Sequence, residues 1–368
     1  MSPVTRDRAD RCPGVLRPWI ADDGALIRLR LVGGELDAGA LRRLASVAEA
    51  FGDGNLHLTS RANLQIRGIA HTGGRLSAEL VEAVREAGLL PSPTHERVRN
   101  ILVSPLTGLA SGRANLRPVA AELDRLLCAD PELAGLPGKF LFCLDDGRGD
   151  VSADRFDLGL FALDASHAQV RIGTAHRGPA IPLSEAPEAL LAFARKFLRI
   201  RGNGDAAAWH VDELPQTGRE LLDAPPFSEP RPDFVAPTPF LGESGLDARS
   251  PETADGLPET PLAHPPRTHD VIPVPLFDRS TEPYPRTPKA EGRLPETPFT
   301  RLPRTHVAPV PPFGGIGQDD GRQAGHFAVP GGLLSAREAV RLASLGSRII
   351  VTPWRSIIIP DISASELL

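Results

Sequence analysis

The sequence is short of long apolar runs, and it carries no strong excess of positive charge. None of its 368 residues belongs to an uninterrupted apolar stretch of about 18 residues, so no membrane span is expected. The N-terminal segment MSPVTRDRADRCPG has no apolar core and is not typical of a secretory signal. The net charge is −5, which argues against a general affinity for nucleic acid.

Cysteine is also scarce. Cys12, Cys128 and Cys143 form an odd, widely spaced set without a C-x-x-C pair. This usage indicates a reducing, cytoplasmic setting rather than a disulfide framework, and it gives no local zinc or cluster signal. Cys128 falls in a predicted helix and Cys143 in a predicted strand, where buried structural roles are expected.

Lysine is the third shortage, because 38 arginines stand against only Lys139, Lys196 and Lys289. A GC-rich genome would produce this bias. Guanidinium groups also suit carboxylates and phosphates, which they bind with two parallel hydrogen bonds. Composition alone does not separate the two explanations.

Residues 14–97 read as alternating strands and helices. ALIRLRLV (25–32) alternates like a strand, and Asp37 is placed to cap a helix that ends near Gly52. A second strand follows, and then Ser77 caps AELVEAVREAG, which stops at Gly88. This order predicts a ferredoxin-like α+β half-domain.

Residues 98–212 continue the pattern as a second domain. Strands are expected at NILVSPL, KFLFCLD, DLGLFAL and QVRIG, and helices at RPVAAELDRLLCAD and APEALLAFARKFLRI.

Residues 213–325 differ in composition, because 23 of the 38 prolines lie between positions 225 and 330. The stretch LPETPLAHPPRTHDVIPVPLF (257–277) returns as LPETPFTRLPRTHVAPVPPF (294–313). Such sequence buries too little apolar surface to offset its ordering entropy, so we predict a duplicated, disordered linker. A proline-rich docking segment in extended conformation is the alternative. His269 and His306 are then a by-product of the duplication rather than a metal site.

Residues 326–368 predict a second ferredoxin-like half. GGLLSAREAVRLASLGSRIIVTPWRSIIIPDI reads as helix, strand, turn and strand, and RLAS occurs at both 43–46 and 341–344. In each half the helix is followed by a strand that reaches Thr-Ser-Arg or Thr-Pro-Trp-Arg. The chain is therefore predicted to contain two related halves.

HLTSRANLQIRG (57–68) carries the most specific pattern. Read as one strand, it places Arg61, Asn63, Gln65 and Arg67 in a single polar row. Arg61 and Arg67 would lie about 20 Å apart, which suits a broad ligand with several anionic groups. A solvated face of an antiparallel strand would look the same.

Strand ends add further candidates. Arg99 and Asn100 come directly before one predicted strand, and Lys139 opens another. We predict that Arg61, Arg99 and Lys139 converge on one concave surface, floored by Asn63, Gln65 and Arg67. Pseudo-symmetry would bring Arg355 of the second half to the same region.

At these residues the sequence resembles the sulfite and nitrite reductase superfamily, whose members hold a tetrapyrrole against paired ferredoxin-like halves. The similar stretches are DGALIRLRLVGGELDAGALRRLASVAEAFGDGNLHLTSRANLQIRGI, RNILVSPLTG with LPGKF, and GGLLSAREAVRLASLGSRIIVTPWRSIIIP. RCPGVLRPWIADDGALIRLRL and VTPWRSIIIPDI are most similar to the precorrin-3B synthase family of aerobic cobalamin biosynthesis. The resemblance leaves out the proline-rich insert.

The resemblance implies an oxygen-dependent monooxygenase that converts precorrin-3A to precorrin-3B. It assigns Arg61, Arg99 and Lys139 to the carboxylate-rich tetrapyrrole, while the catalytic residues stay unknown. The family's second lysine of K-x-K is replaced by Leu141, which argues against sulfite or nitrite reduction. A non-catalytic tetrapyrrole- or partner-binding descendant is the alternative, and a siroheme reductase is a weaker one.

The family also implies iron, as a [4Fe–4S] cluster and, in the reductase branch, siroheme. Its four cluster cysteines lie beyond the second half, whereas this sequence stops at Leu368. We therefore expect this chain alone to bind no cluster, because thiolates are what hold one. A separate iron–sulfur polypeptide and an unidentified electron donor would complete the enzyme. His57, His71 and His95 could ligate iron, but their spacing gives no metal-site signal.

Overall fold

A computed structural model describes residues 10–152, 155–223, 309–363 and 365. Residues 224–308, which make up most of the predicted linker, lie outside these residues, so its disorder stays a prediction. Residues 314–325, which we assigned to the linker, instead contain one whole strand and the start of another. The second half therefore begins earlier than residue 326. The glycine-rich sequence GGIG has little intrinsic strand preference, which is why the pattern missed it.

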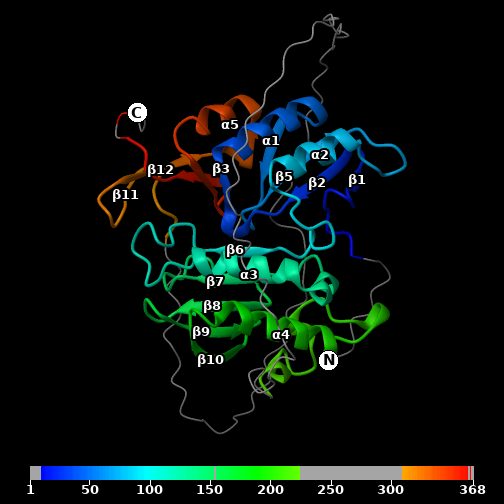
Figure 1. The fold of residues 1–368 in the computed structure, drawn as a ribbon, viewed down its shortest axis with the longest axis vertical. Helices are drawn as coiled ribbons and strands as arrows, with labels where there is room; N and C mark the ends of the chain where they lie inside the picture. Colours follow the sequence, from blue (N-terminus) through cyan, green and yellow to red (C-terminus); the bar gives the residue numbers. More distant parts are fainter. Residues whose placement is uncertain (1–9, 153–154, 224–308, 364, 366–368) are drawn as a thin grey trace, which may run out of the picture. The chain divides into compact units, whose positions relative to one another are not determined.

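The first half is an antiparallel five-stranded sheet with two helices, α1 and α2 (Figure 1). Asp37 caps α1 by accepting a hydrogen bond from Ala40 N, and Ser77 caps α2 by accepting from Leu80 N, so both predicted caps are confirmed. The sheet order is β1 (Trp19–Ala21), β2 (Gly24–Leu29), β5 (Leu64–Ile69), β4 (Asn55–Leu58) and β13 (Leu333–Ser335), with α1 at Ala38–Phe51 and α2 at Ala78–Glu86.

The second half repeats this architecture with one helix, α5, which packs beside α1 (Figure 1). Ser335 caps α5 by accepting from Glu338 N. The sheet order is β11 (Gly314–Gly317), β12 (Gln323–Ala328), β15 (Ser356–Ile359), β14 (Arg348–Val351) and β3 (Glu35–Asp37), with α5 at Ala336–Leu342.

The two halves exchange one short strand each. β3 leaves the first half and pairs with β14, and β13 leaves the second half and pairs with β4. Each exchanged strand follows a Gly-Gly turn, Gly33–Gly34 or Gly331–Gly332, whose residues all have positive φ. Apolar side chains from both halves form one continuous core. The halves are therefore joined by backbone pairing as well as by packing.

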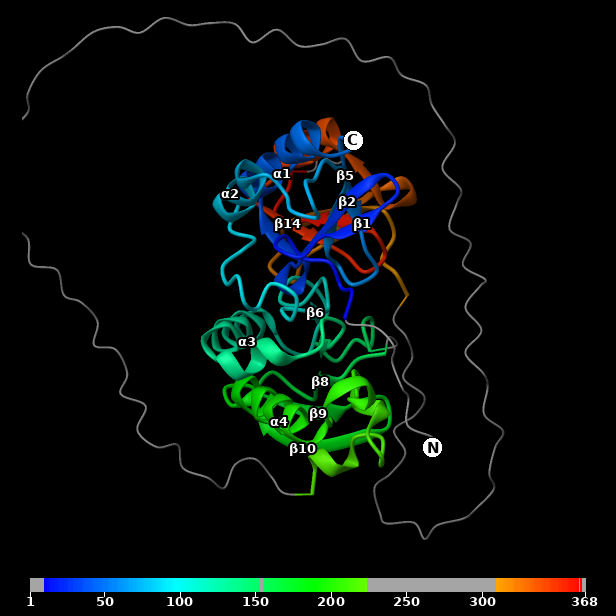
Figure 2. The same cartoon turned by 90° about the vertical axis from the view of Figure 1, so that its right-hand side faces the viewer.

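A third sheet follows the first half, with α3 and α4 packed together on one face (Figure 2). Its strands β6, β7 and β8 are parallel, and β9 and β10 extend it antiparallel. The predicted helices and strands of this domain are present, and β10 is an addition. The bounds are β6 Ile101–Val103, β7 Phe142–Asp145, β8 Leu158–Ala162, β9 His167–Ile172, β10 His176–Pro182, α3 Arg117–Ala129 and α4 Ala186–Ile200.

The two faces of this third sheet carry different cores. Ile101 and Val103 point into the large core under α3 and α4. Leu102 points the other way, into a small cluster with Leu141 and with Ala62 of the first half. Within the described part of the chain, no helix is long and apolar enough to cross a lipid bilayer.

Candidate functional site

The segment 57–68 is a hairpin and not the single strand that its alternation predicts. β4 ends at Leu58 and β5 begins at Leu64. Between them, Thr59 N donates to the Asn63 carbonyl (2.9 Å), and Ala62 N donates back to the Thr59 carbonyl (3.1 Å). The Thr59 hydroxyl also accepts from Asn63 N (3.1 Å), and Ala62 has φ 54°. Local bonds of this kind compete with strand pairing, and residue alternation does not reveal them.

Arg61 therefore lies at a hairpin tip, where it meets the Lys139 segment. Its Nη1 donates to the Lys139 carbonyl oxygen at 3.0 Å, while Lys139 itself is exposed. The structure thus places the Arg61 guanidinium on the backbone of Lys139, one of the two residues predicted to converge with it.

Arg28 is a further cation of this site, and our sequence reasoning missed it. It pairs with Gln65 across strands β2 and β5. In the amide orientation that satisfies both groups, the Gln65 side-chain oxygen accepts from Arg28 Nη2 (2.7 Å) and Arg28 Nε (3.0 Å). Burial lowers the pKa of Arg28, and the nearby Arg61 charge lowers it further. Two like charges are held close here, an arrangement that an anionic ligand would relieve. We call Arg28, Arg61, Gln65 and Lys139 the cationic surface.

Asn100 lies behind this surface and organises it. Its Nδ2 donates to the carbonyls of Gly138 (3.0 Å) and Phe140 (3.1 Å), on either side of Lys139. Its Oδ1 accepts from Arg30 Nε at 2.9 Å. Asn100 is only 2% exposed, and both its side-chain oxygen and its side-chain nitrogen are hydrogen-bonded within the protein. The structure therefore gives it a supporting role behind the surface, in place of the direct ligand contact that we predicted.

Arg30 is almost completely buried, and it ties the N-terminal segment to the site. Its Nη1 donates to the carbonyls of Pro13 and Glu96, both at 3.0 Å. Burial lowers its pKa to about 10, with Arg28 adding to the effect. Its Nη2 has no hydrogen-bond partner among the described residues.

Arg99 does not join Arg61, so the predicted convergence of three cations is wrong. Arg99 binds Asp124 of α3 with two parallel hydrogen bonds of 2.6 and 2.8 Å. Asp124 belongs to the helix-covered face of the third sheet, whereas Ala62, next to Arg61, packs on the opposite face. Successive residues of an extended chain point to opposite sides, so Arg99 and Asn100 diverge.

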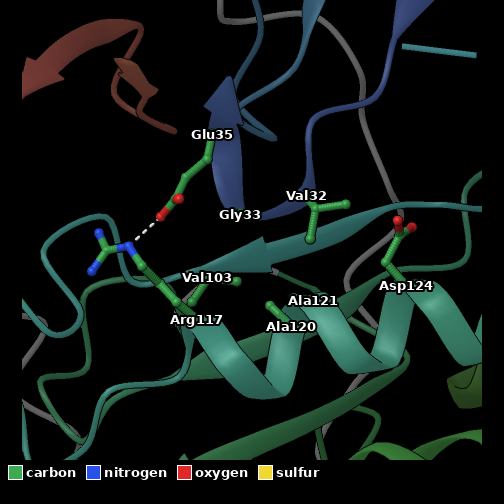
Figure 3. A pocket seen from close by; sticks show the side chains of 8 residues that line it. All are labelled: Val32, Gly33, Glu35, Val103, Arg117, Ala120, Ala121 and Asp124. Atoms are coloured by element: carbon green, nitrogen blue, oxygen red, sulfur yellow. Dashed lines mark hydrogen bonds and ion pairs between the residues drawn. The ribbon is translucent and has the colours of Figure 1, made fainter. Parts of the chain in front are cut away.

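A cavity with a volume of about 300 Å³ lies beside this ion pair. Figure 3 shows the side chains that line it. Val32, Val103 and the two alanines of α3 give it apolar walls. Arg117 and Glu35 form an ion pair at one end, and Asp124 stands two helical turns away. Because both carboxylates already have arginine partners, the cavity adds no free charge to the site. Its lining residues are Val32, Gly33, Glu35, Val103, Arg117, Ala120, Ala121 and Asp124.

The other predicted ligand residues have local partners. Asn63 is 2% exposed, and its Oδ1 accepts from Leu31 N (2.9 Å). Arg67 lies 3.3 Å from Asp23 in a half-exposed pair. Arg67 Nε has no hydrogen-bond partner among the described residues. The predicted role of Asn63 and Arg67 as the floor of the surface stays a prediction.

Arg355 is the counterpart of Ala62 and not of Arg61 in the repeated hairpin, and its predicted approach to the same region stays a prediction. Thr352 N donates to the Ser356 carbonyl (3.0 Å), and Arg355 N donates to the Thr352 carbonyl (3.1 Å), as in the first hairpin. Arg355 has φ 59°, matching Ala62. The residue at the position of Arg61 is Trp354, so the second half contributes no equivalent cation.

The described residues do not fit an iron–sulfur cluster. Cys12, Cys128 and Cys143 lie on three different segments and form no disulfide with one another. Among the described residues, the one set of three closely spaced metal-ligand side chains is Asp145, Asp146 and Asp150, and it contains no thiolate. The cationic surface, in contrast, suits carboxylate groups in general, because guanidinium and carboxylate form charge-assisted hydrogen bonds.

Two five-stranded halves that exchange strands, placed beside a third sheet, define the nitrite and sulfite reductase class of fold. Residues 21–73 match the family model "Nitrite/Sulfite reductase ferredoxin-like half domain". The fold is also that of the Mycobacterium tuberculosis NirA protein, with a TM-score of 0.60 at 19% identity over 98% of this chain and 58% of that chain. The chain is therefore similar to this family in sequence over residues 21–73, and it has the nitrite/sulfite reductase fold.

Curated relatives cover two activities. A precorrin-3B synthase of Sinorhizobium sp is 30% identical over 162 residues, which span 44% of this chain and 32% of the relative. A ferredoxin–nitrite reductase of Leptolyngbya laminosa is 33% identical over 149 residues, spanning 38% and 28%. A ferredoxin–nitrite reductase of Synechococcus elongatus is 25% identical over 242 residues, spanning 58% and 46%. The chain thus spans less than half the length of each of these relatives.

Proposed function

We propose that this chain is a precorrin-3B synthase-like protein of cobalamin biosynthesis that binds a carboxylate-rich tetrapyrrole on the cationic surface. The observation that carries the proposal is the meeting of Arg61 with Arg28 and the Lys139 segment. Precorrins bear several acetate and propionate groups, and a rigid pair of guanidiniums suits two of them. Oxidation of precorrin-3A to precorrin-3B is the proposed reaction of the completed enzyme.

The residues of this chain have binding and positioning roles in that reaction. Arg61 and Arg28 hold ligand carboxylates, and Gln65 orients the Arg28 fork. Asn100 keeps Lys139 in place through the carbonyls on both sides of it. An iron–sulfur group, if a separate polypeptide supplies it, would provide the electrons. The electron donor and this polypeptide are proposed partners of the chain.

Leu141 favours this proposal over a siroheme-dependent reductase. It takes the place of the second lysine of K-x-K, and it is 1% exposed within the apolar cluster that includes Ala62. A small anion such as sulfite or nitrite would find no cation there. A non-catalytic tetrapyrrole-binding protein is the second candidate, because the described cysteines do not gather into a cluster site.

The test is titration of uroporphyrin, a porphyrin with eight carboxylates, followed by fluorescence quenching. Removing a desolvated charge-assisted contact costs roughly 1.5–3 kcal/mol, so Arg61→Ala should weaken binding by about ten- to a hundredfold. Arg125→Ala is the matched control, because Arg125 is an exposed arginine on α3 that pairs only with its helix neighbour Glu122. Equal affinities of the wild type and Arg61→Ala would refute the proposed site.

A further inference from the structure

Three aspartates gather at the carboxyl end of β7, beside the end of the parallel strand β6. Asp145 is the last residue of β7, and Asp146 and Asp150 lie on the loop that follows it. One carboxylate oxygen from each residue lies within 4.8 Å of the other two. Asp145 is 1% exposed, Asp146 is 0% exposed and Asp150 is 8% exposed. Three carboxylates are thus buried together, at the edge of a sheet where α/β folds commonly bind ligands.

Two oxygens of this cluster are buried without a hydrogen-bond partner among the described residues. Asp145 Oδ1 accepts from Gly147 N and Gly149 N, both at 2.9 Å, but Asp145 Oδ2 has no partner. Asp150 Oδ1 accepts from Ser104 Oγ at 2.6 Å, but Asp150 Oδ2 has no hydrogen-bond donor. A carboxylate oxygen that has lost its water and found no donor is costly. Both oxygens therefore point to a ligand that brings positive charge.

Arg148 supplies only part of that charge. Its Nη2 donates to Asp146 Oδ2 at 2.5 Å, and its Nε lies 3.6 Å from Asp150 Oδ2. Arg117 and Arg171 act on the cluster electrostatically, but within the described part of the chain neither forms an ion pair with it. One guanidinium in contact with three carboxylates leaves two negative charges uncompensated. A divalent cation would balance them.

The carboxyl groups also repel one another. Burial raises the pKa of Asp145, although the nearby Ser152 hydroxyl acts to lower it. Burial raises the pKa of Asp150 to about 6, and the charges of Asp146 and Asp145 add to this rise. At neutral pH the ionised cluster is therefore under electrostatic strain, which a bound cation would relieve.

The donor atoms and their spacing favour calcium. Carboxylate oxygens are the ligands that hard cations prefer, and the cluster holds neither imidazole nor thiolate. Two oxygens bound to one Ca²⁺ lie at most about 5 Å apart, and two bound to one Mg²⁺ at most about 4.2 Å. The spread of up to 4.8 Å fits Ca²⁺ and would have to tighten for Mg²⁺. We propose that Asp145, Asp146 and Asp150 bind one Ca²⁺ ion, whose remaining ligands are water.

The ion would fix the loop between β7 and β8. Ser104, directly after β6, already holds this loop, because its hydroxyl accepts from Asp146 N at 3.1 Å. Val151 and Phe156 of the same loop pack in the apolar cluster that contains Ala62 of the first hairpin. A bound ion should therefore stabilise the contact between the third domain and the first half. This role does not depend on the tetrapyrrole.

The test is calorimetric titration of CaCl₂ into the chelator-treated chain, together with thermal unfolding. We expect a dissociation constant on the order of 10–100 μM, within the range of protein calcium sites. At 1 mM CaCl₂ the unfolding midpoint should rise by about 3–10 °C, and equal MgCl₂ should raise it less.

Two variants locate the ion. Asp145→Asn and Asp150→Asn keep the side-chain shape but remove one charge each, and either should weaken Ca²⁺ binding at least tenfold. Asp164→Asn, at an exposed turn, is the control and should bind Ca²⁺ as the wild type does. Eu³⁺ luminescence of the wild type needs no variant that folds. Its lifetimes in H₂O and D₂O count bound waters, and an ion on three buried carboxylates should keep fewer waters than the free ion.

Each outcome decides for or against the site. If the wild type shows neither binding heat nor a midpoint shift, Arg148 alone balances the cluster and the proposal is wrong. Equal Ca²⁺ affinity of the wild type and both cluster variants would place the ion on exposed acidic groups, and a fully hydrated Eu³⁺ would do the same. A stronger response to Mg²⁺ than to Ca²⁺ would refute the choice of ion.

Discussion

Replacement of Gly34 by alanine tests the close contact between the two halves of the repeated fold. Gly34 has φ 76°, and a Cβ there would lie far inside the contact distance of the Val351 carbonyl oxygen at the end of β14. It would also lie 3.1 Å from Ala62 Cβ at the hairpin tip. The left-handed backbone costs a non-glycine residue about 1–2 kcal/mol, and overpacking adds about 1–3 kcal/mol. We expect Gly34→Ala to lower the free energy of unfolding by about 2–5 kcal/mol.

Gly54→Ala is the matched control, because it isolates the backbone part of this cost. Gly54 has φ 81°, but nothing lies within 4 Å of a Cβ there. It should therefore lose only the cost of the left-handed conformation, about 1–2 kcal/mol. The assay is chemical unfolding at 25 °C, followed by circular dichroism and tryptophan fluorescence. If Gly34→Ala is no less stable than Gly54→Ala, the close contact between the halves is not as described.

Substitutions at three further positions probe the interior of the site. Leu141→Lys should cost about 3–5 kcal/mol in stability, because an ammonium would enter an apolar cluster. The control Leu141→Met should cost less than about 1.5 kcal/mol. A well-tolerated lysine that binds sulfite would contradict the buried position. Arg30→Met should cost about 2–4 kcal/mol in denaturant unfolding, because Asn100 and two carbonyls lose their donor; a neutral effect would speak against that network. For Asp157, folding raises the pKa from about 3.9 to about 8, so the unfolding free energy of the wild type should fall between about pH 4 and pH 8 relative to Asp157→Asn; parallel pH profiles of the two proteins would exclude a buried ionising carboxyl.

The regular elements could be predicted from sequence because they depend on local signals. The spacing of apolar residues located α1, α3 and α4, and the side chains of Asp37 and Ser77 located two helix starts. The exchanged strands β3 and β13 could not be predicted in this way. Each has three residues, and each is stabilised by pairing with the other half rather than by its own sequence.

The site was predicted in part, and the predictions that failed have a common physical cause. The position of Arg61 close to Lys139 follows from a family pattern, but the direction of a side chain depends on local backbone geometry. Ala62 turns the chain at a left-handed backbone position. Arg99 and Asn100 are adjacent in an extended segment, so their side chains point to opposite sides. Arg28 could have been found, because ALIRLRLV places it on the polar side of the strand, opposite the buried Ile27 and Leu29.

The two halves have diverged most at the cationic surface itself. At the positions of Arg28 and Arg61, the second half has His326 and Trp354. His326 Nδ1 lies 3.0 Å from the Pro311 carbonyl oxygen, and its Nε2 lies 2.6 Å from Ser356 Oγ.

The matching position of Gln65 is Ile358, which is buried against Leu106 and Leu109 of the third domain. The same face that is polar and accessible in the first sheet is therefore covered in the second. Because one hairpin keeps its guanidinium and the other has an indole, an internally repeated fold presents a single, asymmetric surface. A ligand with unevenly distributed carboxylates, such as a precorrin, matches such a surface better than a symmetric one would.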